Sequence, residues 1–184
     1  MKDQIKKGVL FAVIIIVLVG GVFLEMFFSK KNSAPSTNNN PVGYSYQTLG
    51  LNINSPLKLV LTDAGVNTTK LTPEDDKYKE KVYAIVAEIS SETVKKMNGA
   101  SLLQNAKGIY MGATKPATEK VERSISNTKI TGELQKTTIP KPSTLESYLV
   151  QNSTGKTFFV GIKYQTTKEE IDSFVDSLLA SIQK

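Results

Sequence analysis

The chain has 184 residues, carries a formal net charge of +6, and contains no cysteine, histidine or tryptophan. Without cysteine and histidine it cannot form disulfides, Ser-His or Cys-His nucleophile pairs, or the usual zinc, haem and iron–sulfur sites. Carboxylate, lysine and tyrosine chemistry remain available, and so does calcium or magnesium binding through oxygen atoms. Arg123 is the only arginine, so nucleic-acid binding is not expected.

Residues 8–28, "GVLFAVIIIVLVGGVFLEMFF", form the first predicted element. A helix of this length spans roughly 30 Å, which matches the hydrocarbon core of a bilayer. A cleaved export signal has a shorter apolar region and small residues at its end, whereas this segment ends in Met26, Phe27 and Phe28. The segment therefore predicts a single transmembrane helix that stays on the protein; a cleaved signal is the alternative.

The residues around this helix predict where the rest of the chain lies. Lysines flank both ends, with more positive charge on the N-terminal side, which favours an N-terminus inside the cell. We expect a short cytoplasmic segment at 1–7, the transmembrane helix at 8–28, a flexible linker rich in Ser, Asn and Pro at 29–43, and a domain outside the cytoplasm at 44–184. The expected location is the cell membrane.

The first part of this domain alternates between apolar and polar residues. Leu51 and Ile53 indicate a half-buried strand that ends near Pro56, and Leu57, Leu59 and Leu61 indicate a second that closes at Gly65. The next stretch is polar, and Thr72-Pro73-Glu74 suggests a helix start or a capped turn. Residues 82–90, "VYAIVAEIS", are apolar on both faces and predict a central strand.

A helical region follows, with Ser91 as a candidate N-cap and a break at Gly99. Four strand-like stretches come next: "KVERSIS", "TKITGELQKTTI", "TLESYLVQ" and "KTFFVGIKY". Pro140 and Pro142 separate the second stretch from the third, and "NSTG" predicts a hairpin between the last two. In the last stretch, alternate residues from Phe158 to Tyr164 line one face.

The chain ends in a predicted amphipathic helix. Its apolar residues recur at helical spacing, which indicates a face packed on a sheet: Ile171, Phe174, Val175, Leu178, Leu179 and Ile182. Thr166 with Glu169, or Thr167 with Glu170, matches a capping box. The order of strands, helix, antiparallel strands and helix predicts an α+β fold, with an antiparallel β-sheet packed by helices.

Four segments carry a resemblance to a known family: "LGLNINSP", "YAIVAEISS", "KITGELQKT" and "FFVGIKYQTTKEEIDSFVDSLLASI". Together they resemble the PsbP-like fold family, which includes small bacterial envelope proteins and an extrinsic photosystem subunit. The resemblance covers most of residues 44–184 and implies an α/β/α sandwich. Because this chain has no histidine, a photosystem role is not implied, and the fold itself hosts unrelated functions.

Three motifs suggest chemistry, and each has a structural explanation. Ser55-Pro-Leu-Lys58 matches the S-x-x-K pattern of penicillin-binding enzymes, but Pro56 puts it at a strand junction. Gly155-Lys-Thr157 lacks the first glycine of a P-loop. The consecutive carboxylates of residues 74–76 lack the alternating spacing of a calcium loop.

No catalytic, cofactor-binding or metal-binding residue is therefore predicted, and no cofactor is expected. The expected function is that of a non-enzymatic binding module, anchored in the membrane, that contacts a protein or another envelope component. The alternatives are a carrier of a small molecule or lipid and a carboxylate-dependent hydrolase. The sequence does not identify the partner, the binding surface or the oligomeric state. Seven tyrosines are spread along the domain, and none stands out as a site.

Overall fold

The computed structural model of this chain describes residues 43–113, 119–138 and 140–184. The chain divides into two units, Met1–Ala34 and Pro35–Lys184, and the described residues belong to the second. The transmembrane helix expected at 8–28 and the linker expected at 29–43 lie outside the described residues, except for Gly43. Within the described ranges, no helix has both the length and the apolar character needed to cross a membrane.

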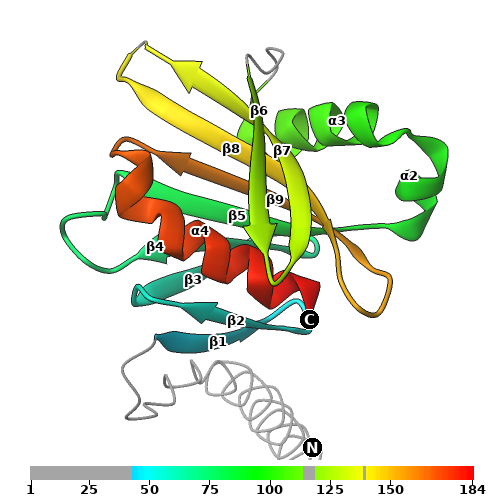
Figure 1. Cartoon of the computed structure of the whole chain (residues 1–184), viewed down its shortest axis with the longest axis horizontal. Helices are drawn as coiled ribbons and strands as arrows, with labels where there is room; N and C mark the ends of the chain where they lie inside the picture. Colours follow the sequence, from blue (N-terminus) through cyan, green and yellow to red (C-terminus); the bar gives the residue numbers. More distant parts are fainter. Residues whose placement is uncertain (1–42, 114–118, 139) are drawn as a thin grey trace, which may run out of the picture. The chain divides into compact units, whose positions relative to one another are not determined.

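The central sheet has seven antiparallel strands in the order β3-β4-β5-β9-β8-β7-β6 (Figure 1). Its strands are β3 (Leu59–Gly65), β4 (Thr68–Pro73), β5 (Val82–Ile89), β6 (Glu119–Ile125), β7 (Thr128–Thr137), β8 (Ser143–Gln151) and β9 (Thr157–Tyr164). The order places β5 and β9 near the middle, where most of their residues are buried on both faces. The central strand predicted at 82–90 is therefore confirmed.

Helices cover both faces of this sheet (Figure 1). On one face, here called the α4 side, α4 (Lys168–Gln183) packs through fully buried residues such as Phe174 and Leu178. On the opposite face, here called the α3 side, lie α2 (Ser91–Lys96) and α3 (Gly99–Met111). There Leu102 and Ala106 of α3 pack on Phe159 of β9. The α+β class and the buried face of the C-terminal helix are as predicted.

A separate hairpin of β1 (Tyr44–Thr48) and β2 (Leu51–Ser55) packs against α4 and the sheet. Leu51 and Ile53 are almost completely buried and alternate with exposed neighbours, as the sequence pattern predicts. The Tyr46 hydroxyl accepts a hydrogen bond from the Leu59 amide at 2.6 Å, and the Ser181 hydroxyl accepts one from the Asn54 amide at 2.9 Å. These bonds fix the hairpin to β3 and α4.

Close packing between β7 and β8 depends on Gly132, the glycine inside "KITGELQKT". Gly132 lies opposite Tyr148 in the register of the two strands. A Cβ atom at this position would lie 2.4 Å from two ring carbons of Tyr148 and 2.6 Å from the Ser147 carbonyl oxygen. Since Tyr148 is fully buried, its ring occupies the space that any larger residue would need.

At Thr72-Pro73-Glu74, where a helix start or a capped turn is predicted, the structure has no helix, because β4 runs to Pro73. A turn follows directly, and the Lys77 amide donates to the Asp75 carboxylate there at 2.7 Å. Threonine is β-branched and suits an extended strand, although it leaves no apolar alternation to read. Leu71 is fully buried, and the Thr69 hydroxyl lies 2.6 Å from that of Thr48 in the hairpin. The Glu74 amide then donates to the Lys58 carbonyl at 2.9 Å, which extends the pairing past Pro73.

The helix ends differ from the predictions in two places. The N-cap of α2 is Ser90, one residue before the predicted Ser91, and its side chain accepts from the Thr93 amide. Thr167 is the N-cap of α4 but makes no side-chain capping bond, so neither expected capping box forms there. Glu170 instead forms an ion pair with Lys77 at 3.0 Å. The break at Gly99 is confirmed, because α3 begins there.

Candidate binding groove

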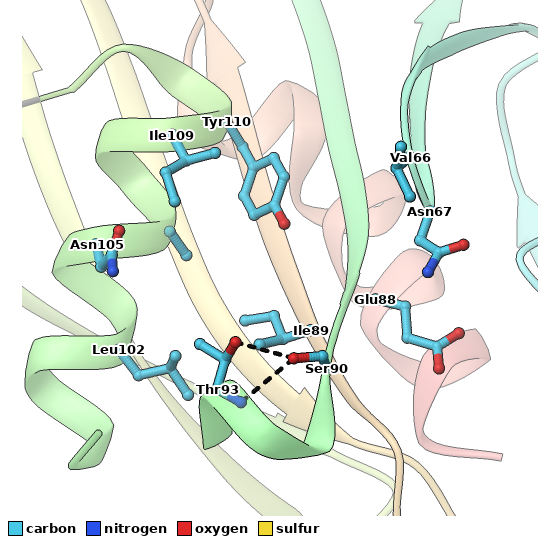
Figure 2. A pocket seen from close by; sticks show the side chains of 11 residues that line it. Val66, Asn67, Glu88, Ile89, Ser90, Thr93, Leu102, Asn105, Ile109 and Tyr110 are labelled. Atoms are coloured by element: carbon cyan, nitrogen blue, oxygen red, sulfur yellow. Dashed lines mark hydrogen bonds between the residues drawn. The ribbon is translucent and has the colours of Figure 1, made fainter. Parts of the chain in front are cut away.

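A groove of about 310 Å³ opens on the α3 side, between α3 and the tip that joins β3 to β4 (Figure 2). The end of β5 and the start of α2 form its floor. Its two walls come from segments far apart in the sequence. It is the candidate functional site of this domain, because it combines an apolar lining with two strongly exposed apolar side chains.

The first wall is the face of α3. Leu102 and Ala106 are buried against the sheet, and Ile109, one helical turn further on, is 68% exposed. The Tyr110 ring stacks on Phe159 with the ring centroids 5.5 Å apart, which fixes the ring along the groove. The helical spacing that buries one part of this face thus also carries Ile109 past the sheet and into the open.

The second wall is the turn between β3 and β4. Gly65 and Asn67 both have positive φ angles, +135° and +51°, which allow the chain to reverse tightly around Val66. The Glu88 amide donates to the Asn67 carbonyl at 3.0 Å and ties the turn to β5. As a result, Val66 is 91% exposed, and its apolar side chain faces water.

The polar groups on the floor already have partners. The Ser90 hydroxyl accepts from the Thr93 amide at 3.2 Å and lies 2.9 Å from the Thr93 hydroxyl (Figure 2). The Glu88 carboxylate is paired with Lys156, with the closest approach at 2.9 Å. No floor residue is placed to act as a free acid or base. The groove therefore offers mainly apolar contact.

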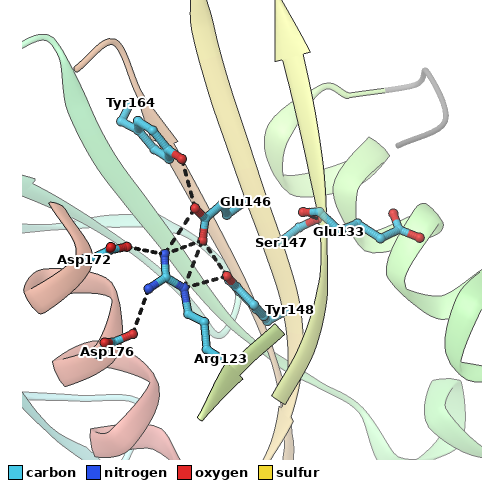
Figure 3. A network of polar contacts seen from close by, with 8 residues as sticks. All are labelled: Arg123, Glu133, Glu146, Ser147, Tyr148, Tyr164, Asp172 and Asp176. Carbon is cyan, nitrogen blue, oxygen red and sulfur yellow. Dashed lines mark hydrogen bonds and ion pairs between the residues drawn. The ribbon is translucent and has the colours of Figure 1, made fainter. Parts of the chain in front are cut away.

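A second polar arrangement lies on the α4 side, around Arg123 of β6 (Figure 3). Its guanidinium donates to the Glu146 carboxylate with bonds of 2.8, 3.1 and 3.2 Å. It also donates to the Tyr148 hydroxyl at 2.9 Å and to Asp176 at 2.8 Å, and lies 2.9 Å from Asp172. One side chain thus joins β6, β8 and α4.

Burial determines the electrostatics of this network. Glu146 is fully buried, and its two oxygens also accept from the hydroxyls of Tyr148 and Tyr164. Burial and the neighbouring Glu146 carboxylate raise the pKa of both phenols far above the ordinary tyrosine value. Burial alone would lower the pKa of Arg123, but Tyr148 and Glu146 raise it more, so the net shift is upward.

This network meets one condition for carboxylate chemistry, because Glu146 is completely withdrawn from water. It fails a second condition, since both oxygens of Glu146 are already occupied by Arg123 and the two tyrosines. The arrangement is that of a buried structural ion pair between β6 and β8, which α4 joins through Asp172 and Asp176.

The motifs that the sequence singled out have structural roles. The Ser55 hydroxyl donates to the Leu57 carbonyl and accepts from the Leu57 amide, which makes it part of a turn. Gly155 has a φ of +83° in the β8–β9 hairpin, as predicted. The Glu74 carboxylate pairs with Lys58 at 2.6 Å. Among the described residues, no cluster of acidic side chains is arranged to hold a metal ion.

The sequence holds one signal for each of these two sites. Arg123 lies between Val121 and Ile125 at alternate positions of "KVERSI", so a charged residue occupies the buried face of a strand. Ile109 and Tyr110 continue the apolar spacing of α3 beyond the buried residues. Neither signal shows which distant segment lies opposite.

The chain matches no protein-family model and no curated protein. Among solved structures, it is similar to a mutant of the protein Mog1, with 13% sequence identity and a TM-score of 0.45, over 80% of this chain and 88% of that chain. At these values the likeness carries no argument about function. The resemblance to the PsbP-like family is not confirmed by these comparisons.

Proposed function

We propose that this chain is a membrane-anchored, non-enzymatic binding module whose domain lies outside the cytoplasm and contacts a protein or another envelope component through the α3-side groove. The observation that carries the proposal is the pair of apolar side chains on facing walls, Val66 and Ile109, which are 91% and 68% exposed. Large apolar residues gathered around an open groove are typical of a contact surface.

The membrane anchor is supported by the sequence. Residues 8–28 have the length and apolar character of a transmembrane helix, and residues 29–43 have the composition of a flexible linker. A tethered domain meets other molecules at the membrane at a raised local concentration, so a contact surface of modest affinity is sufficient.

The packing of the α4 side supports a surface groove over an internal carrier cavity. Fully buried residues of α4, such as Phe174 and Leu178, pack directly on buried residues of the sheet. The hydrolase alternative rests on Glu146, the fully buried carboxylate. Its complete set of partners favours a structural role, because general acid–base catalysis needs a group that can exchange a proton with substrate.

Site-specific photo-crosslinking of the full-length protein tests this proposal. A benzoyl-phenylalanine at position 109, in the protein's own membranes, is expected to give a discrete adduct with a protein or a lipid. The matched control carries the same group at Ser173, an exposed position on α4. Adducts from position 109 alone support the groove. No adduct, or equal adducts from both positions, contradicts it.

A further inference from the structure

The α3 side carries the exposed apolar residues of the described structure. Three large apolar side chains are exposed among the described residues: Val60 at 46%, Val66 at 91% and Ile109 at 68%. Val66 and Ile109 line the groove. Val60 points to the same side, because its neighbours Leu59 and Leu61 pack in the α4-side core and side chains alternate along a strand. The exposed large apolar side chains therefore lie on the α3 side, where their contact with water is unfavourable.

Two lysines without ion-pair partners among the described residues lie on the same side of the sheet. Lys70 of β4 and Lys163 of β9 point to the α3 side, since their neighbours Leu71 and Ile162 belong to the α4-side core. The Lys70 ammonium lies 4.9 Å from the centre of the Tyr83 ring, and Lys163 pairs with Tyr83 in register. Within the described part of the chain, neither lysine forms an ion pair.

The helices give the two sides opposite charge. Together, α2 and α3 carry three lysines against the single carboxylate of Glu92, whereas α4 carries one lysine against four carboxylates. The carboxylates of Glu92 and Glu133 on the α3 side are each paired with a lysine, Lys96 and Lys107. The uncompensated charge of the α3 side is therefore positive.

Exposed apolar residues that share one side with uncompensated lysines are the features of a surface that binds anionic lipid bilayers. We infer that the component contacted by the α3 side is the anionic phospholipid surface of the membrane in which the chain is anchored. The lysines contact the headgroups, and Val60, Val66 and Ile109 enter the interfacial region. This inference rests on the proposed function, because the anchor holds the domain near the bilayer.

The chain outside the structure supports this occupant. The described residues begin at Gly43, and a flexible linker of residues 29–43 would give a root-mean-square reach of about 20 Å. The domain would then sample the bilayer surface at high local concentration. A soluble partner would have to compete with a surface that is always within reach. The negative charge of α4 would keep the opposite side away from the same lipids.

The test uses the full chain in lipid nanodiscs and exploits the absence of cysteine. A single Thr62→Cys substitution, at an exposed position of β3 on the α3 side, carries the polarity-sensitive fluorophore NBD. Its emission is expected to rise at least about twofold in discs of phosphatidylcholine with phosphatidylglycerol, relative to phosphatidylcholine alone. The same label at Ser173→Cys is expected to show no difference.

A charge variant identifies the residues responsible. Replacing Lys70 and Lys163 with glutamine is expected to lower the ratio of docked to free domain roughly thirtyfold, from the usual contribution of a lysine near an anionic surface. The matched control replaces Lys168 and Lys184, on and just after α4, by glutamine and is expected to keep the emission gain. Circular dichroism of each variant confirms that it folds.

Three results would overturn the inference: equal emission in both kinds of disc, an equal gain at Ser173, or a gain that survives loss of Lys70 and Lys163. If NBD emission rises in phosphatidylcholine discs only after soluble polyglycerol phosphate is added, the occupant is an anionic polymer. That result also excludes the lipid surface. If position 109 still gives a protein adduct in native membranes, the inference fails while the proposed function stands. If no adduct forms either, both fail.

Discussion

Removing the positive charge of Arg123 is expected to destabilise the domain more than any surface charge change. Arg123 is 7% exposed and Glu146 is fully buried, so Arg123→Met leaves a carboxylate without its counter-ion in a dry environment. Breaking a buried ion pair on one side costs about 3–5 kcal/mol. The carboxylates of Asp172 and Asp176 add little to this cost, because they reach solvent, with side chains 39% and 47% exposed.

A double-mutant cycle separates the pair from its surroundings. Glu146→Gln removes the buried negative charge but keeps an oxygen that can accept from Tyr148 or Tyr164. The double variant Arg123→Met/Glu146→Gln is therefore expected to lose less than the sum of the two single losses, by about 2 kcal/mol. The matched surface control is Lys96→Met, which breaks an ion pair whose side chains are 70% and 77% exposed, and is expected to cost no more than about 0.5 kcal/mol.

Urea unfolding of the full chain in detergent, followed by far-ultraviolet circular dichroism, measures these free energies of unfolding. The structure requires that Arg123→Met unfold at a much lower urea concentration than the wild-type protein and the Lys96→Met control. If Arg123→Met loses less than about 1 kcal/mol, or if the double variant shows no coupling, the buried pair does not hold β6 and β8 together and the reasoning is wrong.

Three further predictions concern packing, pH and topology. Gly132→Ala is expected to lower the free energy of unfolding by about 1–3 kcal/mol, because its Cβ would overlap the buried Tyr148 ring. In the control Gly108→Ala, nothing lies within 4 Å of the new Cβ, and the temperature of thermal unfolding should rise instead. The raised pKa values of Tyr148 and Tyr164 keep both phenols protonated in the folded state. Their contribution to the free energy of unfolding is therefore full below about pH 10 and falls above it, by up to about 2.7 kcal/mol per pH unit while both remain protonated. Ultraviolet titration showing that these two phenols ionise before the domain unfolds would refute this. Protease added to intact cells should remove the domain together with a surface control, and a protected domain would mean that the predicted orientation is inverted.

The sequence predicted the elements whose burial repeats at a regular spacing. The apolar stripe of α4 and the alternation in β2 and β9 are local patterns, so they could be read without knowing their partners. β4 was not predicted because its polar threonines do not show the apolar alternation of a strand. In the structure the Thr69 hydroxyl contacts the Thr48 hydroxyl of the neighbouring hairpin. Gly132 lies within one of the four segments that carry the family resemblance, but only Tyr148 explains why no side chain fits there.

Neither the Arg123 network nor the groove could be predicted from local sequence patterns. The network joins Arg123 to residues 23 to 53 positions further along the chain. The groove requires the β3–β4 turn to lie opposite α3. A single sequence shows that Arg123 and Ile109 occupy unusual positions, yet the segment that each one faces is set by the order of strands in the sheet. The order places β4 beside β5, which carries the Val66 turn toward the floor of the groove.

Protection of the groove in native membranes tests the central claim most directly. Hydroxyl-radical footprinting compares the full-length protein in its own membranes with the same protein purified in detergent. The account predicts that the peptides containing Val66 and Ile109 become several-fold less reactive in the membranes, while the peptide of α4 does not change. Equal reactivity of Val66 and Ile109 in the two states, or protection of α4 instead, would contradict it.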